Sequence, residues 1–250
     1  MTVRVLTFNT LFRGEARARI GALAGIVERG GHDVVCLQEV ISPFILTRLR
    51  RGTPSYPHLA RARAFPLVRG GLVTLSRHPV ERRHFLTFTA VRPARPEWLL
   101  RKGALFTRVR LPGGYLTVVN THLSANMDLD WSPSNVYAKT ERAELCELAA
   151  AINRIPKAEP MVVVGDFNVP RKSPLFEEFA QVTGLKDVMV GDTGPTFRPE
   201  VEVIEPIDQV LVRPGLDASA RVVFKDEVPL PDGRTTFLSD QYGIAVTLDE

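Results

Sequence analysis

The sequence predicts an α/β fold in which two apolar sheets pack against each other and helices lie outside them. Short apolar and β-branched runs, typical of buried strands, recur along the whole chain, and segments with helical spacing separate several of them. Hydrophobic residues make up 44% of the 250 residues, which is enough for a sizeable core. No repeat, low-complexity tract or linker-like change in composition divides the chain, so we expect one domain over residues 1–250.

The first unit is predicted to be a strand, a helix and a second strand. The run VRVLTF (3–8) is apolar and β-branched and ends at Asn9. Apolar residues then recur at helical spacing, at Ile20, Leu23, Ala24 and Val27. The glycine pair at 30–31 ends this helix, and the apolar run DVVCLQEV (33–40) follows it. Glu39 is therefore expected just beyond a buried strand.

The middle of the chain predicts four strands and a long helix. The strands are expected in GGLVTLS (70–76), HFLTFTAV (84–91), GALFTRVRL (103–111) and YLTVVN (115–120). The PGG turn at 112–114 joins the last two as a hairpin, which ends at His122. A helix is expected from about Val136 to Arg154, because Leu145, Leu148, Ala149 and Ile152 share one face.

In the last third of the chain, the sequence predicts mainly strands. PMVVVGDFN (160–168) is a short apolar strand that breaks at Gly165. IDQVLV (207–212) and RVVFKD (221–226) precede the final run LSDQYGIAVTL (238–248). The two cysteines, Cys36 and Cys146, lie in a strand-like and a helix-like run, so we expect both to be core thiols.

Polar residues fall at or just outside the ends of these predicted strands. They are Asn9, Glu39, His122, Asp166, Asn168, Asp208 and Asp240. Any one of them alone would usually be a turn or cap residue, but together they predict side chains that converge at one rim of the sheets. Carboxylates brought this close raise each other's pKa unless a cation or basic groups offset them. An oxygen-rich set without cysteine favours Mg²⁺ or Mn²⁺ over Zn²⁺.

Two short motifs carry most of this signal. In GDFN (165–168), Gly165 permits a sharp turn, Asp166 accepts a proton or orients a water, and Asn168 offers an uncharged donor to a phosphoryl oxygen. His122 follows a strand with small polar neighbours, which favours titration near neutral pH and a role as general acid. An ordinary Asp-Asn turn and a structural histidine are the alternatives.

The motifs, in their order along the chain, resemble those of the endonuclease/exonuclease/phosphatase family, and most of all its neutral sphingomyelinase-like phosphodiesterases. They are TFNT (7–10), LQEV (37–40), GGLVTLSRHPV (70–80), NTHL (120–123), GDFN (165–168), IDQVLV (207–212) and LSDQYG (238–243). The resemblance covers almost the whole chain. It implies a four-layer α/β/β/α sandwich, with two packed, mostly antiparallel sheets and the active site at one end of them.

The resemblance also implies residue roles. Glu39, assisted by Asn9, would bind a divalent metal, and Asp240 would complete the acidic metal site. Asp166 and Asn168 would handle the nucleophilic water and a phosphate oxygen.

On the leaving-group side, the resemblance assigns His122 to protonate the leaving group or stabilise the pentacovalent phosphorane. Lys102, from a Lys-Gly pair that such members often have, is a candidate phosphate contact beside His122 and Asn168. A solvated lysine is the alternative.

Gln241 departs from the family pattern. The motif SDQ would ordinarily be SDH, with the histidine paired to the aspartate of the ID motif, here Asp208. A glutamine amide donates and accepts hydrogen bonds but cannot take up a proton. Three accounts stay open: an enzyme that uses Asp166 with metal-bound water, a degenerate binding protein, or an engineered substitution that stalls catalysis.

These observations predict a Mg²⁺-dependent phosphoric ester hydrolase, a phosphodiesterase in which water attacks in line. A lipid head group or small-molecule phosphate is the favoured substrate, with Trp131 and Tyr137 as aromatic surfaces or as core residues of their loop. Nucleic acid stays possible, although no dense basic patch with interleaved aromatics favours it. The alternatives are a nuclease or phosphatase of the same family and a non-catalytic phosphate-binding protein.

The charge and hydropathy patterns add little to this hypothesis. The net charge of +4, from 32 basic and 28 acidic residues, fits a phosphate-bearing substrate but also a plain solvated surface. No apolar run approaches the roughly 18 residues that span a bilayer, and the N-terminal residues lack a leader pattern, so we expect a cytoplasmic location. The oligomeric state is not predicted.

Overall fold

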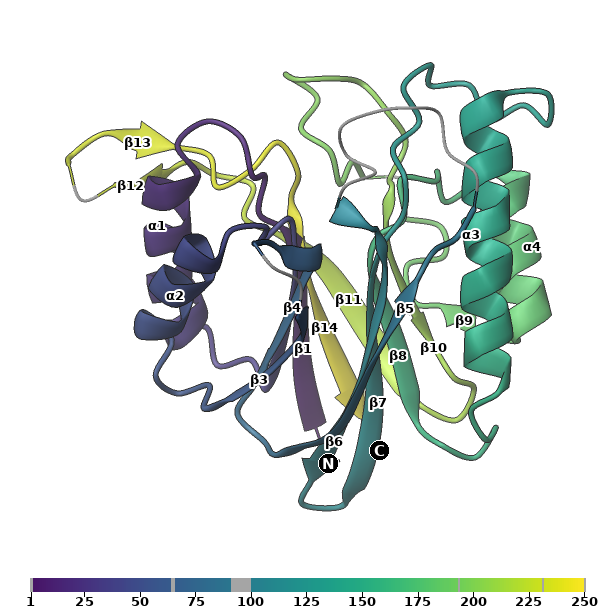
Figure 1. Cartoon of the computed structure of the whole chain (residues 1–250), viewed down its shortest axis with the longest axis horizontal. Coiled ribbons are helices and arrows are strands. Elements are labelled where there is room, and N and C mark those ends of the chain that lie inside the picture. The colour runs from purple at the N-terminus through teal and green to yellow at the C-terminus, as the bar shows by residue number, and fades with distance from the viewer. Residues whose placement is uncertain (1, 64–65, 91–99, 193, 231, 250) are drawn as a thin grey trace.

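The structure is a computed structural model that describes residues 2–63, 66–90, 100–192, 194–230 and 232–249. Two six-stranded sheets face each other, and the helices of the described residues lie on their outer faces (Figure 1). The predicted α/β/β/α sandwich is therefore confirmed. No helix among these residues is both long and apolar enough to cross a membrane.

The first sheet has the strand order β11-β14-β1-β2-β4-β3. Its strands are β1 (Thr2–Asn9), β2 (Val34–Gln38), β3 (His58–Arg63), β4 (Val68–Ser76), β11 (Asp217–Val223) and β14 (Gly243–Asp249). Only the central pair β1 and β2 is parallel, and α1 (Ala16–Arg29) makes the crossover between them. Helix α1 and the shorter α2 (Pro43–Arg51) cover the outer face of this sheet (Figure 1).

The second sheet has the order β5-β6-β7-β8-β10-β9. Its strands are β5 (Val80–Thr87), β6 (Gly103–Leu111), β7 (Gly114–His122), β8 (Met161–Asp166), β9 (Lys186–Asp187) and β10 (Asp208–Val212). Again only the central pair, β7 and β8, is parallel, and α3 (Val136–Asn153) connects them. Helices α3 and α4 (Pro174–Thr183) cover the outer face, while β12 (Val228–Pro229) and β13 (Thr235–Thr236) form a separate small hairpin.

The sequence missed some elements and misplaced others. Strand β5 begins at Val80 rather than at 84. Its first residues were missed because β5 is an edge strand and residues 81–84 are exposed and polar. The last residue predicted for it, 91, lies outside the described residues. Strand β3 and helices α2 and α4 were not predicted. Both helices carry a serine N-cap followed by proline, at 42–43 and 173–174, a signature that identifies helix starts. Cys146 is exposed on α3, so the expectation of two core thiols was half wrong.

Three apolar layers hold the sandwich together. Residues of both sheets, among them Val5, Val118 and Val162, form the layer between the sheets. A second layer packs the first sheet against α1 and α2, and a third packs the second sheet against α3 and α4. Because side chains alternate along a strand, β1 divides its residues, with Val3 and Val5 facing the other sheet and Leu6 and Phe8 facing α1.

We expect Gly165→Ala to destabilise the fold by at least about 2 kcal/mol, as urea unfolding would measure. Gly165 has a φ of 143°, and a Cβ atom on it would lie 2.0 Å from the carbonyl oxygen of Thr121 on the neighbouring strand. Gly114→Ala is the matched control, because Gly114 has a φ of 155° but no atom within 4 Å of the added Cβ. Equal losses in both variants would show that backbone strain, and not the close approach of the strands, requires Gly165.

Candidate active site

The layer between the sheets changes from apolar to polar at one end. On β1, the alternation that directs Val3 and Val5 between the sheets continues through Thr7 to Asn9. On β8, the same alternation runs from Val162 and Val164 to Asp166. Strand β7 carries His122, and β10 carries Asp208, at the same end, since Asp166 pairs with both residues in the sheet register. The sheet geometry therefore brings these side chains together.

A buried polar pair joins the sheets directly below this end. The Gln38 amide donates to Asn120 Oδ1 across the interface at 2.7 Å, and also to Thr7 Oγ1 at 3.1 Å. In return, Asn120 Nδ2 donates to the carbonyl oxygens of Leu37 and Val73 in the first sheet. Gln38 and Asn120 are both fully buried. These hydrogen bonds fix how the two sheets are placed relative to each other beneath the site.

Asp166 lies at the centre of the polar end. Its Oδ2 accepts hydrogen bonds from Asn9 Nδ2 and from Gln241 Nε2, each at 2.9 Å, and its Oδ1 accepts one from the backbone N–H of Asn168 at 2.9 Å. Burial raises the pKa of Asp166, while Lys102 and these three donors oppose the rise. The carboxylate is thus desolvated but surrounded by donors.

Glu39 lies beside Asp166 and shares its Asn9 partner. Asn9 Nδ2 is 3.3 Å from Glu39 Oε1, and the backbone N–H of Phe12 donates to Oε2 at 2.9 Å. Glu39 has a φ of 63°, and a Cβ atom on Gly71 would lie 3.1 Å from its Cα, so a glycine is needed beside it. Burial raises the pKa of Glu39, and the negative charge of Asp166 adds to the rise.

Lys102 and His122 form a buried pair that also lies beside Asp166. Lys102 Nζ is 2.9 Å from His122 Nε2, which in turn is 3.5 Å from Asp166 Oδ2. Leu123 O accepts a hydrogen bond from Lys102 Nζ at 2.7 Å and one from Asn168 Nδ2 at 3.0 Å. Lys102 is only 3% exposed, so it is not the solvated lysine of the alternative prediction.

Gln241 and Asp208 each carry an oxygen with no hydrogen-bond partner among the described residues. These atoms are Gln241 Oε1 and Asp208 Oδ2, both in buried side chains. Burial raises the pKa of Asp208 well above its ordinary value, and repulsion by Asp166 contributes next. The amide of Gln241 donates to Asp166, so the described contacts do not show the Asp208 pairing expected at position 241. The backbone N–H of Asp208 donates to Thr196 Oγ1, and a side-chain hydrogen bond with Thr196 opposes the rise in the pKa of Asp208.

Asp240 lies at the margin of the group. Its Oδ1 accepts a hydrogen bond from Ser239 Oγ at 3.1 Å. Burial raises the pKa of Asp240, and repulsion by Asp166 contributes to the rise. Burial rather than mutual repulsion is therefore the main cause of the raised carboxyl pKa values at this site, in contrast to the sequence argument.

Arg19 belongs to the site but was not predicted from the sequence. Its Nη2 donates to the carbonyl oxygens of Leu11 and Arg13, at 2.5 and 2.6 Å, and so holds the turn whose N–H groups bind Asn9 and Glu39. Leu11 in this turn has a φ of 50°. Burial lowers the pKa of Arg19, while the charges of Asp240, Glu15 and Glu39 oppose the shift. Its position on the buried face of α1, beside Ile20, was the only sequence signal.

Glu141 on α3 is a second buried titratable group that the sequence did not indicate. Both of its carboxylate oxygens lack a hydrogen-bond partner among the described residues. Burial raises the pKa of Glu141 to about 9, and the nearby side chains of Asn126 and Trp131 only partly offset this. Trp131 is half-buried against the core, and its Nε1 donates to Asn168 O at 3.3 Å. Of the two predictions for Trp131, the structure thus supports a core residue of the loop.

A magnesium site is not preformed by three acidic ligands. Among the residues that the structure describes, no group of three or more His, Cys, Asp or Glu side chains is arranged to hold a metal ion. The Asn9 amide nitrogen faces both carboxylates, and its oxygen accepts from the N–H of Leu11 at 3.0 Å. Asn9 therefore holds Glu39 and Asp166 together as a hydrogen-bond donor.

The order of the motifs and the sandwich agree with comparisons to known proteins. A model of the Endonuclease/Exonuclease/phosphatase family matches residues 6–240. The chain belongs to this family. Its members are hydrolases that act on phosphate esters, so the chain has a phosphoesterase fold.

The individual proteins that resemble this chain have low sequence identity to it. Sphingomyelinase C 2 of Leptospira interrogans is 28% identical over 117 residues, which is 46% of this chain and 18% of that protein. A beta toxin of Staphylococcus aureus, solved with bound magnesium ions, has a TM-score of 0.80 at 16% identity and covers 98% of this chain and 99% of its own. TDP2 of D. rerio, complexed with a single-strand DNA product, has a TM-score of 0.78 at 15% identity and covers 100% and 99%. These two structures share the fold.

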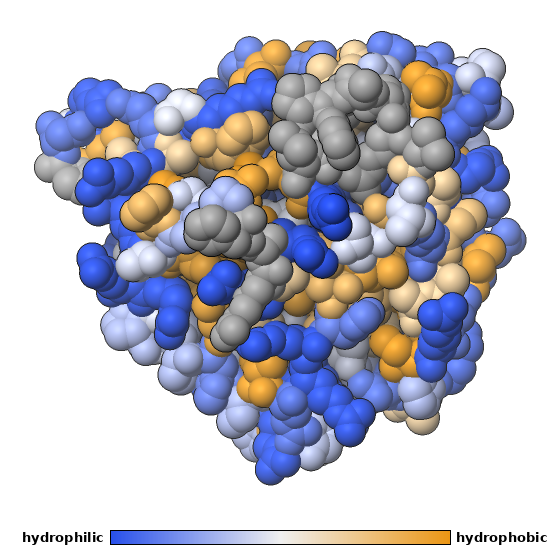
Figure 2. Space-filling view, in the orientation of Figure 1, coloured by the Kyte–Doolittle hydropathy of each residue, from blue (hydrophilic) through white to orange (hydrophobic). Residues whose placement is uncertain are grey.

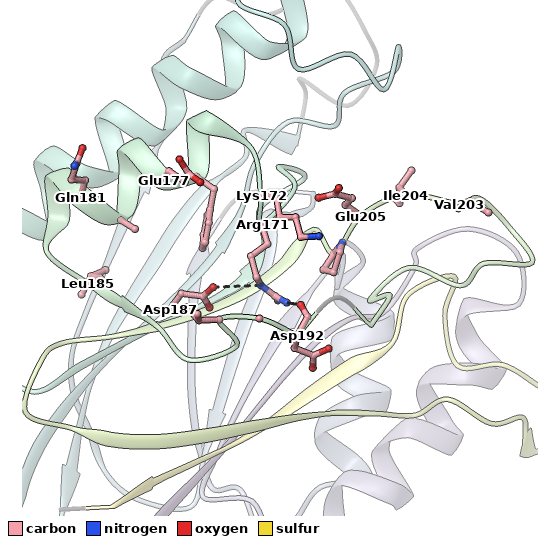
Figure 3. A pocket seen from close by; sticks show the side chains of 15 residues that line it. Arg171, Lys172, Glu177, Gln181, Leu185, Asp187, Asp192, Val203, Ile204 and Glu205 are labelled. Carbon is pink, nitrogen blue, oxygen red and sulfur yellow. Dashed lines mark hydrogen bonds and ion pairs between the residues drawn. The ribbon is translucent and has the colours of Figure 1, made fainter.

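A separate cavity of about 890 Å³ lies between α4 and the segments 190–192 and 203–206 (Figure 3). None of the predicted site residues lines it. Arg171 lines this cavity, and its guanidinium donates to Asp208 O at 3.1 Å and to Gln209 Oε1 at 3.0 Å. Arg171 thus supports the start of β10, where Asp208 lies.

We expect Arg19→Met to loosen the turn at residues 11–13. The variant loses two hydrogen bonds from a charged donor, so the amide of Phe12 should exchange with solvent about tenfold faster or more. Hydrogen exchange followed by NMR would measure this. Arg29→Met, an exposed residue of the same helix, is the control. An unchanged Phe12 amide in Arg19→Met would show that the turn holds Glu39 without the arginine.

We also expect Glu141→Gln to stabilise the protein increasingly from pH 6 to pH 9. The folded state keeps the Glu141 proton up to a pKa of about 9, whereas the unfolded chain releases it near the ordinary carboxyl value. Wild-type stability therefore falls as pH rises through this range, by about 1 kcal/mol per pH unit from this residue. Urea unfolding across the range measures it, with exposed Glu177→Gln as the control. Parallel pH profiles for Glu141→Gln and wild type would contradict the assignment.

Proposed function

We propose that the chain is a Mg²⁺-dependent phosphodiesterase that hydrolyses a lipid or small-molecule phosphate ester by in-line attack of a water. The observation that carries this proposal is the arrangement around Asp166. An amide, a second amide and a backbone N–H hold its carboxylate, and His122, paired with Lys102, lies 3.5 Å from the same Oδ2 that the two amides contact. Such an arrangement supplies an acceptor for a water proton and donors for an oxyanion within one buried site.

The residues fit a magnesium ion better than a cation that needs a complete protein cage. The available donors are carboxylate oxygens, and Glu39 and Asp166 are held close together by one amide. Mg²⁺ commonly binds through one or two carboxylates and takes its remaining ligands from water and substrate phosphate, so a set of three acidic ligands is not required. Glu39 would hold the ion, with Asn9 keeping its carboxylate in place and Asp240 adding negative charge. When bound, the ion would polarise the phosphoryl and leaving oxygens.

Two proton transfers would be carried out by the protein's own groups, one from the attacking water and one to the leaving oxygen. Asp166 is held with one oxygen toward Asn9 and Gln241 and the other toward Asn168, so it would orient the attacking water and accept its proton. Beside Asp166, His122 Nε2 lies 2.9 Å from Lys102 Nζ, so the two nitrogens would share a proton between them. When substrate enters, Lys102 would turn from Nε2 to a phosphoryl oxygen, and His122, protonated at Nε2, would give that proton to the leaving oxygen. Asn168 would donate to a phosphoryl oxygen after releasing Leu123 O.

Gln241 limits how fast this chemistry can proceed. It donates to Asp166 but cannot accept a proton, and its oxygen lies buried without a partner among the described residues. General acid–base catalysis contributes about 10²–10⁴ in rate, so its loss slows turnover without preventing it. The non-catalytic alternative rests on this one residue.

The substrate class rests on similarity and on the absence of a nucleic-acid signature in the sequence. One relative is a sphingomyelinase, while TDP2 was solved with a DNA product. Because Trp131 packs partly into the core, it does not offer a free stacking face for a base. A lipid or small-molecule phosphate is therefore preferred over nucleic acid.

We expect hydrolysis that depends on Mg²⁺ and falls by about 10²–10⁴ in Asp166→Asn. The assay compares bis-p-nitrophenyl phosphate, sphingomyelin, an inositol phosphate and plasmid DNA, with and without Mg²⁺. Calorimetry should show Mg²⁺ binding that is lost in Glu39→Ala, and Asn168→Ala should reduce turnover without changing Mg²⁺ binding. The exposed Asp226→Asn is the control. Unchanged Mg²⁺ binding in Glu39→Ala, or near-normal turnover in Asp166→Asn, would move the site elsewhere.

We expect Gln241→His to raise turnover by roughly one to a few orders of magnitude and to add a pH dependence. The imidazole would replace an amide that already contacts Asp166, and Asp208 offers an unpartnered, buried oxygen to orient the ring. The pH profile of kcat/KM on bis-p-nitrophenyl phosphate measures the change. If Gln241→His binds Mg²⁺ but stays as slow as the glutamine form, the non-catalytic alternative gains support. Fast turnover by the glutamine form itself would mean that Asp166 suffices as the base.

A further inference from the structure

A groove between α1 and α2 is lined by positive charge. Its volume is about 780 Å³, and its charged lining residues are Arg17, Arg48 and Arg51. No carboxylate lines it, although the chain as a whole holds nearly as many acidic as basic residues. This uneven distribution gives the groove a local positive potential, which favours anionic ligands.

The side chains of the three arginines form no polar contacts that stabilise the fold among the described residues. None of them makes a side-chain hydrogen bond or ion pair with another residue that the structure describes, whereas Arg19, Arg77, Arg171 and Arg213 all bind carbonyl oxygens. Arg48 also does not simply extend into solvent. A Cβ atom on Gly21 of α1 would lie 2.8 Å from its Nη2 and 3.0 Å from its Nε, so the guanidinium lies across the glycine. The groove therefore presents guanidinium groups whose donors are free.

An exposed aromatic residue stands beside these charges. Phe44, the second residue of α2, also lines the groove and is 87% exposed. The opposite side of the same helix buries Leu46 and Leu49 in the core. Exposing an aromatic ring to water to this extent costs free energy, and moving the ring into an apolar environment would recover it.

One end of the groove lies toward the end of the sandwich that carries the candidate active site, and the other end reaches the last turn of α2. Strands β1 and β2 are parallel and end at Asn9 and Gln38, and α1 and α2 each begin a few residues later (Figure 1). Arg17 and Phe44, each the second residue of its helix, thus lie toward the end of Asn9 and Glu39. Figure 2 shows hydrophilic and hydrophobic residues side by side on this face of the molecule.

We propose that the groove between α1 and α2 docks the chain on an anionic lipid surface. Arg17, Arg48 and Arg51 would bind lipid phosphates, which match the planar fork of a guanidinium, and Phe44 would enter the interface between head groups and acyl chains. The exposed Phe44 selects a lipid surface over a soluble anion, because a free phosphate has no apolar part to cover the ring. This inference concerns binding and goes beyond the proposed hydrolysis, since it holds whether or not the chain turns over a substrate.

The test measures sedimentation of the protein with phosphatidylcholine vesicles that contain or lack phosphatidylglycerol. We expect binding only to the anionic vesicles. The variant with Arg17→Gln, Arg48→Gln and Arg51→Gln should partition on the order of 100-fold more weakly. The matched control carries Arg82→Gln, Arg83→Gln and Arg221→Gln, which remove the same charge from exposed positions on β5 and β11. Phe44→Ser should also weaken binding, and this loss should persist at high salt.

Three outcomes would overturn the inference. Equal losses in the two triple variants would mean that overall charge, and not the groove, attracts the vesicles. No binding of the wild type to anionic vesicles would exclude the lipid surface directly. Unchanged vesicle binding in the groove variant, with loss of inorganic phosphate binding by calorimetry, would make the groove a site for a soluble anion. Thermal unfolding confirms that the variants fold, and turnover of bis-p-nitrophenyl phosphate, a soluble ester, separates this test from that of the proposed function.

Discussion

The hydrogen bond between Gln38 and Asn120 is the contact on which the candidate active site depends. Polar side chains buried between two sheets must find partners in each other, because no water is available to them. Gln38 and Asn120 bond to one another and to the neighbouring backbone across the interface, although Gln38 Oε1 has no hydrogen-bond partner among the described residues. At the polar end of the interface, Asn9 likewise joins the sheets, because its amide donates to Glu39 of the first sheet and to Asp166 of the second. The site is thus a continuation of the way in which the sheets are held together.

The residues that face this interface explain why much of the site could be predicted from the sequence. The sequence shows a period of two along both central strands, with Val162, Val164 and Asp166 on one and Val3, Val5, Thr7 and Asn9 on the other. A strand that keeps its period while its inward residues change from valine to carboxylate indicates a buried site. The sequence could not tell that Lys102 is buried, because a lysine at a strand start looks the same whether it meets solvent or an imidazole. Arg19 was missed for a similar reason, since its role lies in binding carbonyl oxygens, which every residue carries. The edge strand β3 was missed and the start of β5 was misplaced, because tertiary packing, more than local pattern, decides where edge strands form. Helices α2 and α4 were missed although each begins with a serine N-cap followed by proline, a local signal that was not used.

The site combines strong desolvation with few positive charges. Burial raises the pKa of Glu39, Asp166, Asp208 and Asp240, and Lys102 is the buried cation that opposes it at Glu39 and Asp166. Keeping four such groups together costs free energy of folding that the apolar layers must offset. The unpartnered oxygens of Gln241 and Asp208 add to this cost, because a buried acceptor without a donor loses its hydration and gains nothing. Such a costly group of buried carboxyls is typical of a site shaped by chemistry rather than by stability.

The pairing of β1 with β14 has a consequence for how the protein is made. Strand β14 spans Gly243–Asp249, yet it lies next to β1, Thr2–Asn9, near the middle of the first sheet. While the ribosome is still adding the residues between them, β1 has one edge unpaired, and Asn9 stands at the end of an incomplete sheet. Non-local pairings of this kind form late and leave an open strand edge that can capture other chains. Because Asp240 and Gln241 directly precede β14, the step that closes this edge also delivers the last residues of the site. A nascent chain therefore completes the candidate site only in the step that also pairs the open edge of β1.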